Sequence, residues 1–99
     1  MQLLTKDLTT KLPFLYSQEY EDDPIVICKF FAPWNSWKWY AIEFDGKDLF
    51  FGYVAGDVPE LGYFSLAELQ IVKGPMGLVI ERDMWFRPCR LSEIKRLHE

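Results

Sequence analysis

The sequence has little of what catalysis and covalent cross-linking usually require. Among 99 residues it has one histidine, His98, and two cysteines, Cys28 and Cys89. Two cysteines without C-x-x-C spacing predict neither a disulfide framework nor a zinc site. His98 is the penultimate residue, where chains commonly fray, so we expect no general base there. Phosphate-loop, nucleophile-elbow and H-E-x-x-H motifs are also missing. These absences favour a non-enzyme without metal or cofactor.

Long apolar runs are missing as well. The longest apolar segments are far shorter than the roughly 20 residues that a membrane span needs. The first residues, 1–7, become charged too early for a signal peptide. Cys28 lies inside the apolar run 25–28, where we expect a buried, inert thiol. The sequence therefore predicts a soluble protein of the reducing cytoplasm that does not contact a membrane.

Positive charge is scarce in the first part of the chain. Residues 1–60 carry ten acidic and five basic side chains, a balance of −5, whereas residues 61–99 carry five acidic and six basic ones, a balance of +1. The densest acidic run is Glu19, Glu21, Asp22 and Asp23, and a solvated loop is the ordinary interpretation of such a run. This balance argues against a nucleic-acid partner, because phosphate binding depends on Lys and Arg.

Aromatic residues are abundant, at 17% of the chain, while the 49% hydrophobic and 26% charged shares are those of an ordinary globular protein. The length fits a single domain over residues 1–99. Each large ring buries on the order of 150–250 Å², so a few rings can fill a small core. Some of them could instead lie on the surface and bind a partner.

Three helices are predicted. Thr5 is a candidate N-cap for a helix whose stripe of Leu4, Leu8 and Leu12 ends before Pro13. Residues 65–68 have the capping-box pattern and predict a short helix through residue 72. Residues 91–97 have apolar positions at helical spacing and predict a C-terminal helix.

Four strands are predicted over residues 25–31, 37–44, 49–55 and 60–64, and residues 76–80 and 84–86 could be strands or extended loops. Alternation places Trp37, Trp39 and Ala41 on one face of the second strand and Tyr40, Ile42 and Phe44 on the other. Asp45-Gly46 indicates a hairpin. The short connections are too brief for parallel crossovers. We therefore predict an α+β fold, with a mainly antiparallel sheet of four to five strands, an N-terminal helix, a short middle helix and a C-terminal helix.

Two polar clusters are candidate sites. Glu81, Arg82 and Asp83 could present an arginine to an anion or carboxylate in a ligand pocket. Salt bridges that fix a loop against the sheet are the preferred interpretation. The carboxylates at positions 43, 45 and 48 could hold a divalent cation. Their spacing matches no metal loop, however, so an ordinary charged turn is preferred.

The Trp-rich segment 30–40 is the most distinctive feature. Exposed Trp and Tyr often bind protein partners, because they combine a large apolar area with a hydrogen-bonding group. Trp39 is expected in the core, and Trp34, in a turn, is the best candidate for an exposed ring. Stacking on single-stranded nucleic acid is a further possibility, which the nearby acidic balance disfavours.

Several short sequence segments resemble those of a family of small bacterial proteins catalogued as domain of unknown function 2958. The resemblance extends over essentially the whole chain. It includes Lys29-Phe30-Phe31-Ala32-Pro33-Trp34, Phe50-Phe51-Gly52-Tyr53-Val54, Glu60-Leu61-Gly62-Tyr63-Phe64-Ser65-Leu66 and Ile80-Glu81-Arg82-Asp83. It implies an accessory protein of plasmids, phages or integrating elements that binds host or defence machinery. It supplies no catalytic residues.

The resulting hypothesis is a non-catalytic, protein-binding accessory protein of a mobile genetic element, such as an inhibitor of a CRISPR–Cas or restriction complex. The partner-binding residues that we predict are Trp34, Trp37, Tyr40, Glu21, Asp22 and Asp23. The alternative is a small-ligand-binding or enzymatic domain with a pocket near Glu81, Arg82 and Asp83.

Overall fold

A computed structural model describes residues 2–99 and has a five-stranded sheet with helices on both faces. The strands in the sheet are β2 (Cys28–Phe31), β3 (Lys38–Phe44), β4 (Leu49–Ala55), β5 (Pro59–Ser65) and β6 (Glu81–Arg82). Their spatial order is β5-β4-β3-β2-β6, and every neighbouring pair is antiparallel. The predicted α+β fold with a mainly antiparallel sheet is therefore confirmed.

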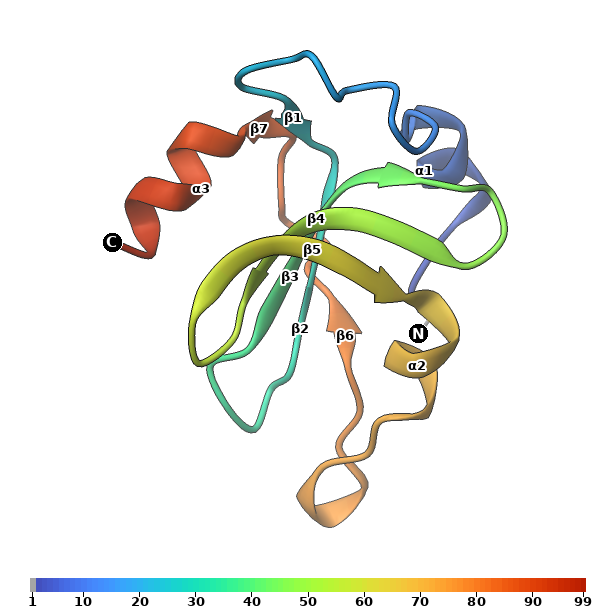
Figure 1. Cartoon of the computed structure of the whole chain (residues 1–99). Helices are drawn as coiled ribbons and strands as arrows, with labels where there is room; N and C mark the ends of the chain where they lie inside the picture. The colour runs from blue at the N-terminus through green and yellow to red at the C-terminus, as the bar shows by residue number, and fades with distance from the viewer. Residues whose placement is uncertain (1) are drawn as a thin grey trace.

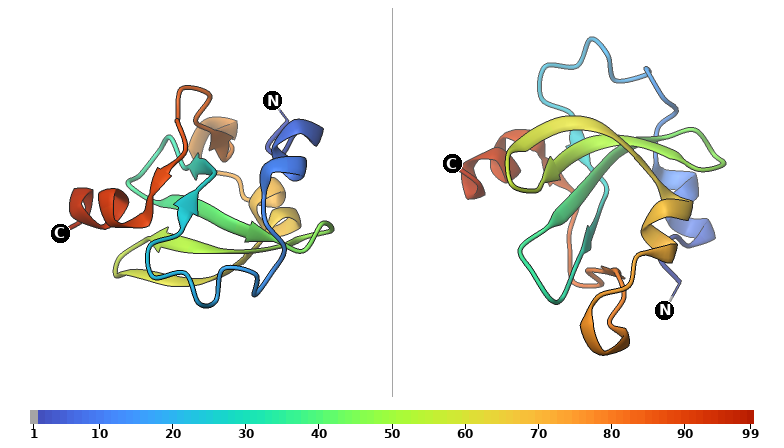
Figure 2. Two further views of the ribbon diagram at one scale, coloured as in Figure 1. Left: turned by 90° about the horizontal axis from the view of Figure 1, so that it is seen from above. Right: turned by 60° about the horizontal axis from the view of Figure 1, so that its bottom comes forward.

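The helices are α1 (Lys6–Lys11), α2 (Leu66–Ile71) and α3 (Leu91–Leu97), with a short 3-10 turn, η1, at Pro75–Gly77. Two short strands, β1 (Ile25–Val26) and β7 (Cys89–Arg90), pair with each other outside the main sheet. Figures 1 and 2 show α1 and α2 on one side of the molecule and α3 with the β1–β7 pair on the other.

The helix starts follow the predicted local signals. The Thr5 hydroxyl accepts a hydrogen bond from the Leu8 N–H at 3.2 Å, and the Ser65 hydroxyl accepts one from the Glu68 N–H at 3.2 Å. Both are N-caps, which satisfy donors that the first turn of a helix leaves unpaired. The hairpin signal also holds, since Gly46 adopts a φ of +85° between β3 and β4.

Some strand boundaries differ from the predicted ones. The first predicted strand, 25–31, is divided at Ile27, so that its beginning pairs with β7 and its end with β3. The ambiguous segment 76–80 is mostly a turn, and the fifth strand of the sheet lies just after it, at β6. Pairing of β6 with β2 joins segments some fifty residues apart, which no local pattern indicates.

Two hydrophobic clusters cover the two faces of the sheet. One lies beneath α1 and α2 and contains Phe30 and Phe50, and the other lies beneath α3 and contains Tyr40 and Ile94. Ala41 belongs to the first cluster, and the partly buried rings of Trp37 and Trp39 pack against it, so all three lie on one face as predicted.

A β-bulge in β3 changes the predicted alternation. The β3–β4 register shifts between Ala41 and Glu43, so Ile42 is an extra residue without an opposite partner. Beyond the bulge, Phe44 lies in the α1–α2 cluster and not with Tyr40 and Ile42. The predicted placement of Phe44 is therefore wrong, because one inserted residue exchanges the two faces of the strand.

Candidate functional site: an acidic aromatic groove

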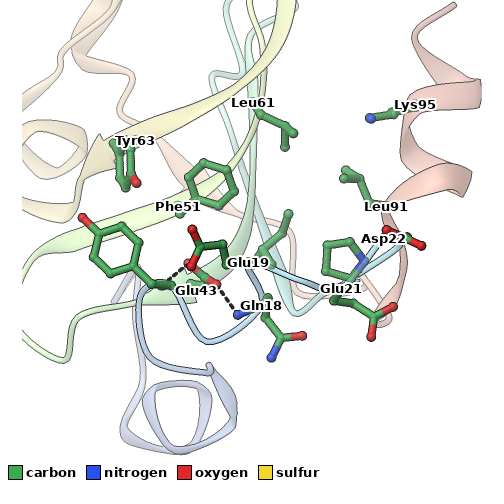
Figure 3. Close-up of a pocket in the computed structure, with 13 residues that line it drawn as sticks. Gln18, Glu19, Glu21, Asp22, Glu43, Phe51, Leu61, Tyr63, Leu91 and Lys95 are labelled. Carbon is green, nitrogen blue, oxygen red and sulfur yellow. Dashed lines mark hydrogen bonds between the residues drawn. The ribbon is translucent and has the colours of Figure 1, made fainter.

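A set of convergent polar and aromatic side chains lines a groove of about 360 Å³ on the α3 face of the sheet. We call it the acidic groove. Its walls come from the loop 13–24, the strands β3, β4 and β5, and the helix α3 (Figure 3). The lining residues are Tyr16, Gln18, Glu19, Glu21, Asp22, Pro24, Ile42, Glu43, Phe51, Leu61, Tyr63, Leu91 and Lys95.

Glu43 is the buried charge of the groove. Its side chain is only 4% exposed, and its carboxylate accepts hydrogen bonds from the N–H groups of Tyr16 at 2.9 Å and Gln18 at 2.7 Å (Figure 3). Burying a carboxylate is costly unless hydrogen bonds compensate. The β-bulge at Ile42 directs the Glu43 side chain to this face, opposite Phe51 on β4.

The backbone of Tyr16 is in an uncommon conformation. Its φ of 69° lies in the left-handed region, where a residue with a bulky side chain is seldom found. The bond from its N–H to Glu43 helps to hold this conformation. Such conformations persist only where several contacts fix them, and they concentrate at functional sites. The loop 13–24 is therefore held against the sheet by the same carboxylate that lies in the groove.

Aromatic rings form one wall. Phe51 and Tyr63 pack edge to face with ring centroids 5.1 Å apart, on neighbouring strands. Tyr16 and Tyr63 remain 64% and 50% exposed. A hydrogen bond with the Tyr16 side chain raises the pKa of Tyr63, and the negative charges of Glu43 and Glu19 add to the effect.

The charge of the lining is strongly one-sided. Four carboxylates, on Glu19, Glu21, Asp22 and Glu43, face one ammonium group, on Lys95. The ion pairs found within residues 2–99 join Asp7 to Lys11 and Lys29 to Asp83, so none neutralises the groove. A cation would be attracted to this surface, and a phosphate would be repelled.

None of the three aromatic residues that were predicted to bind a partner is fully exposed. The ring of Trp34 lies half-buried on Gly74, where an added Cβ would come within 2.3 Å of it, and the ring of Trp37 covers Gly56 at 2.6 Å. Tyr40 is only 2% exposed. The prediction that Trp34 is exposed is therefore wrong, because a glycine elsewhere in the chain accommodates its ring.

The acidic run divides into two roles. Glu21 and Asp22 are exposed and line the groove, as a partner site would require. The Asp23 carboxylate instead accepts hydrogen bonds from the Ser92 N–H at 2.8 Å and the Ser92 hydroxyl at 2.7 Å, at the start of α3. These bonds lower the pKa of Asp23. Asp23 therefore fixes α3 to the loop.

Glu81, Arg82 and Asp83 make structural contacts. The Arg82 guanidinium donates to the backbone oxygens of Gln2 and Leu3, the latter at 2.9 Å, and the Asp83 carboxylate lies 3.5 Å from the Lys29 ammonium. Glu81 is part of β6. These contacts are those of a segment fixed against the sheet. A smaller hollow, of about 150 Å³, lies beside Arg82 and Asp83.

The carboxylates at 43, 45 and 48 do not converge. Asp45 accepts backbone hydrogen bonds from Lys47, Asp48 and Leu49 at 2.8–3.0 Å, and these lower its pKa. Asp48 accepts from Ser65 and from Ala67 at the start of α2. Within residues 2–99, no group of three His, Cys, Asp or Glu side chains could hold a metal ion.

His98 is not frayed. Its Nε2 lies 2.8 Å from the Tyr40 hydroxyl, and its ring packs on Tyr40 and Tyr53. Partial burial lowers the pKa of His98, with Lys38 and Lys29 adding to the effect, and burial raises the pKa of Tyr40 to about 12. This contact joins residues 58 positions apart, so no local sequence pattern indicates it.

The fold and groove together define a small α+β protein with one antiparallel sheet and an acidic, aromatic groove on one sheet face. A scan against protein-family models matches residues 3–97 to the family described as "Protein of unknown function (DUF2958)". The chain therefore belongs to this family, as the resemblance of its short sequence segments predicted. Neither the search of curated proteins nor the search of solved structures returned a match. No helix within residues 2–99 is long and apolar enough to cross a membrane.

Proposed function

We propose that this chain is a non-catalytic accessory protein that binds a basic segment of a protein partner in the acidic groove. The observation that carries the proposal is the set of four carboxylates and one lysine around a wall of exposed aromatic rings. The partner-binding residues then include Glu21 and Asp22 from the sequence prediction. The other partner-binding residues that we propose are Tyr16, Tyr63 and Glu43, instead of the aromatic residues of the Trp-rich segment.

The chemistry of the groove favours a Lys or Arg side chain. The two oxygens of a carboxylate offer about four acceptor positions, and Glu43 uses two of them on the backbone of the loop. A cationic donor complements the negative charge that remains. The faces of Tyr and Phe rings also attract cations, by roughly 0.5–1 kcal/mol at exposed sites. A basic side chain would thus meet carboxylates and rings together.

The biological setting that we propose is the one implied by the resemblance noted in the sequence. A protein of a mobile genetic element that inhibits a CRISPR–Cas or restriction complex would meet many basic surfaces, because such complexes bind phosphates through Lys and Arg. We place its action in the cytoplasm, in keeping with the free thiols of Cys28 and Cys89. An acidic groove could compete for one of these basic surfaces.

Affinity capture from the native host, followed by kinetics with the purified partner, tests the proposal. A groove variant carries Glu19→Gln, Glu21→Gln and Asp22→Asn, and a control variant with the same charge change carries Asp57→Asn, Glu68→Gln and Glu99→Gln. These control residues are exposed and lie outside the groove lining. The groove variant should associate more slowly, with a weaker dependence on salt, because steering by exposed charges is lost.

Replacing Tyr63 by Ala should act mainly on the dissociation rate, since a desolvated aromatic side chain determines how long a complex lasts. A partner that binds the groove variant and the control variant with equal kinetics would show that the groove is not the interface.

The hollow beside Arg82 and Asp83 keeps the ligand-binding alternative open. It is less than half the volume of the acidic groove, and both side chains already have structural partners. If Asp83→Asn abolishes the biological activity while the groove variant retains it, and both proteins remain folded, this hollow is the site.

A further inference from the structure

The strand beside the acidic groove has an open edge. β5 is the first strand in the order β5-β4-β3-β2-β6, so it pairs on one side only, with β4. It spans seven residues, and α2 follows its C-terminal end (Figure 1). Many proteins shorten, charge or cover such an edge to prevent pairing with another chain. In β5 the residues that would hinder such pairing, Pro59 and Glu60, lie only at the beginning of the strand.

The register identifies which backbone groups face outward. The Leu66 N–H donates to the Asp48 oxygen at 2.9 Å, and the Asp45 N–H donates to the Leu49 oxygen at 2.9 Å. In an antiparallel pair, hydrogen-bonded and non-hydrogen-bonded positions alternate. Asp48 and Leu66 are opposite each other in the same register as Gly52 and Gly62, and they are hydrogen-bonded. Every second residue before Leu66, namely 64, 62 and 60, therefore also bonds to β4.

It follows that the N–H and C=O groups of Leu61 and Tyr63 point away from the sheet. Within residues 2–99 no backbone hydrogen bond outside the β4–β5 ladder involves them. An unpaired edge of this kind is a template for an additional strand.

The same two residues direct their side chains into the acidic groove. Glu43 lies opposite Phe51, and Phe51 lies opposite Tyr63, so a row of three side chains crosses the sheet toward the open edge (Figure 3). A strand added beside Tyr63 would continue this row. Because successive side chains alternate between faces, every second residue of that strand would lie over the groove.

We propose that the partner segment binds in extended form as a sixth strand on β5, with Lys or Arg at positions that face the groove. This inference rests on the proposed function and specifies how the basic segment is held. Backbone bonds to Leu61 and Tyr63 supply affinity, and the acidic groove selects the basic side chains. A second copy of the chain fits this edge poorly, since each copy has a net charge of −4 and would bring its own acidic groove.

Short synthetic peptides test the inference with the wild-type protein. One peptide alternates Lys with Val, a control replaces each Lys by Glu, and binding is followed by nuclear magnetic resonance of the backbone amides. The basic peptide should bind and shift the amides of Leu61 and Tyr63, and the acidic peptide should not. N-methylation of the peptide at every second residue should weaken binding about tenfold for each strand hydrogen bond that is lost. N-methylation at the intervening residues should have little effect.

A pair of protein variants supplies the matching measurement. Leu61→Pro removes the outward N–H and the side chain, whereas Leu61→Ala removes only most of the side chain. Leu61→Pro should therefore bind the basic peptide more weakly than Leu61→Ala does. If the basic peptide binds and the groove variant abolishes binding, but N-methylation shows no period of two, strand addition is wrong and the proposed function stands. If no basic peptide binds the folded wild-type chain, both are wrong.

Discussion

Replacing Glu43 by Gln tests whether one buried carboxylate fixes the loop of the acidic groove. The substitution keeps the size of the side chain and removes its charge. The carboxylate accepts two backbone hydrogen bonds, at 2.9 and 2.7 Å, but a Gln has only one acceptor oxygen. One N–H of the loop would therefore lose its partner and face the amide NH₂ group instead.

The expected cost follows from the nature of the lost bond. A hydrogen bond to a charged group contributes about 1.5–3 kcal/mol to the free energy of unfolding. Glu43 is almost fully buried, so solvent screening reduces this value little. For a domain of this length, a loss of about 2 kcal/mol lowers the melting temperature by roughly 10 °C.

Thermal melting followed by circular dichroism measures the effect, and hydrogen exchange of the loop amides locates it. Glu19→Gln is the matched control, because Glu19 lines the same groove but is exposed, and its melting temperature should change little. Equal melting temperatures for the Glu43→Gln variant and the wild type would refute the role assigned to this carboxylate.

Three further predictions concern packing and titration. Gly52→Ala should destabilise the fold by about 1–3 kcal/mol or more in chemical denaturation, because the new Cβ would lie 1.9 Å from a backbone oxygen of β3; Gly62→Ala, with open space around it, is the control. A thiol reagent should modify Cys89 in the native protein and Cys28 only after unfolding, since burial raises the pKa of Cys28 to about 12; equal rates by mass spectrometry would contradict this. The pKa of His98 is lowered on folding, so the unfolded chain binds the proton first, and the stability that is present above pH 6.5 should decrease as the pH falls below it. Denaturation of a His98→Gln variant should show less of this acid sensitivity.

Features with local causes were predictable from the sequence. Thr5 and Ser65 cap their helices because a hydroxyl at that position accepts a bond from the first turn. Gly46 allows the hairpin between β3 and β4 because it adopts a positive φ. In each case the residues that determine the structure lie within a few positions of one another.

The exposure of the aromatic rings was not predictable in this way, because exposure depends on distant residues. Trp34 is half-buried because its ring packs on Gly74, forty positions later in the chain. Trp85, which no pattern distinguished, is 91% exposed. A glycine that accepts a ring from another segment leaves no periodic signal in the sequence. The number of tryptophans in the sequence therefore does not tell which rings lie at the surface.

The role of Glu43 shows most clearly why the groove depends on the tertiary structure. Without the bulge at Ile42, strict alternation would direct the Glu43 side chain toward the opposite face, into the cluster that contains Phe50. An unpaired carboxylate there would be strongly destabilising. The inserted residue turns it instead toward the loop, where the N–H groups of Tyr16 and Gln18 compensate for its burial. The bulge, the left-handed Tyr16 and the carboxylate thus depend on one another, so a change at any of them should affect both the stability of the loop and the charge of the groove.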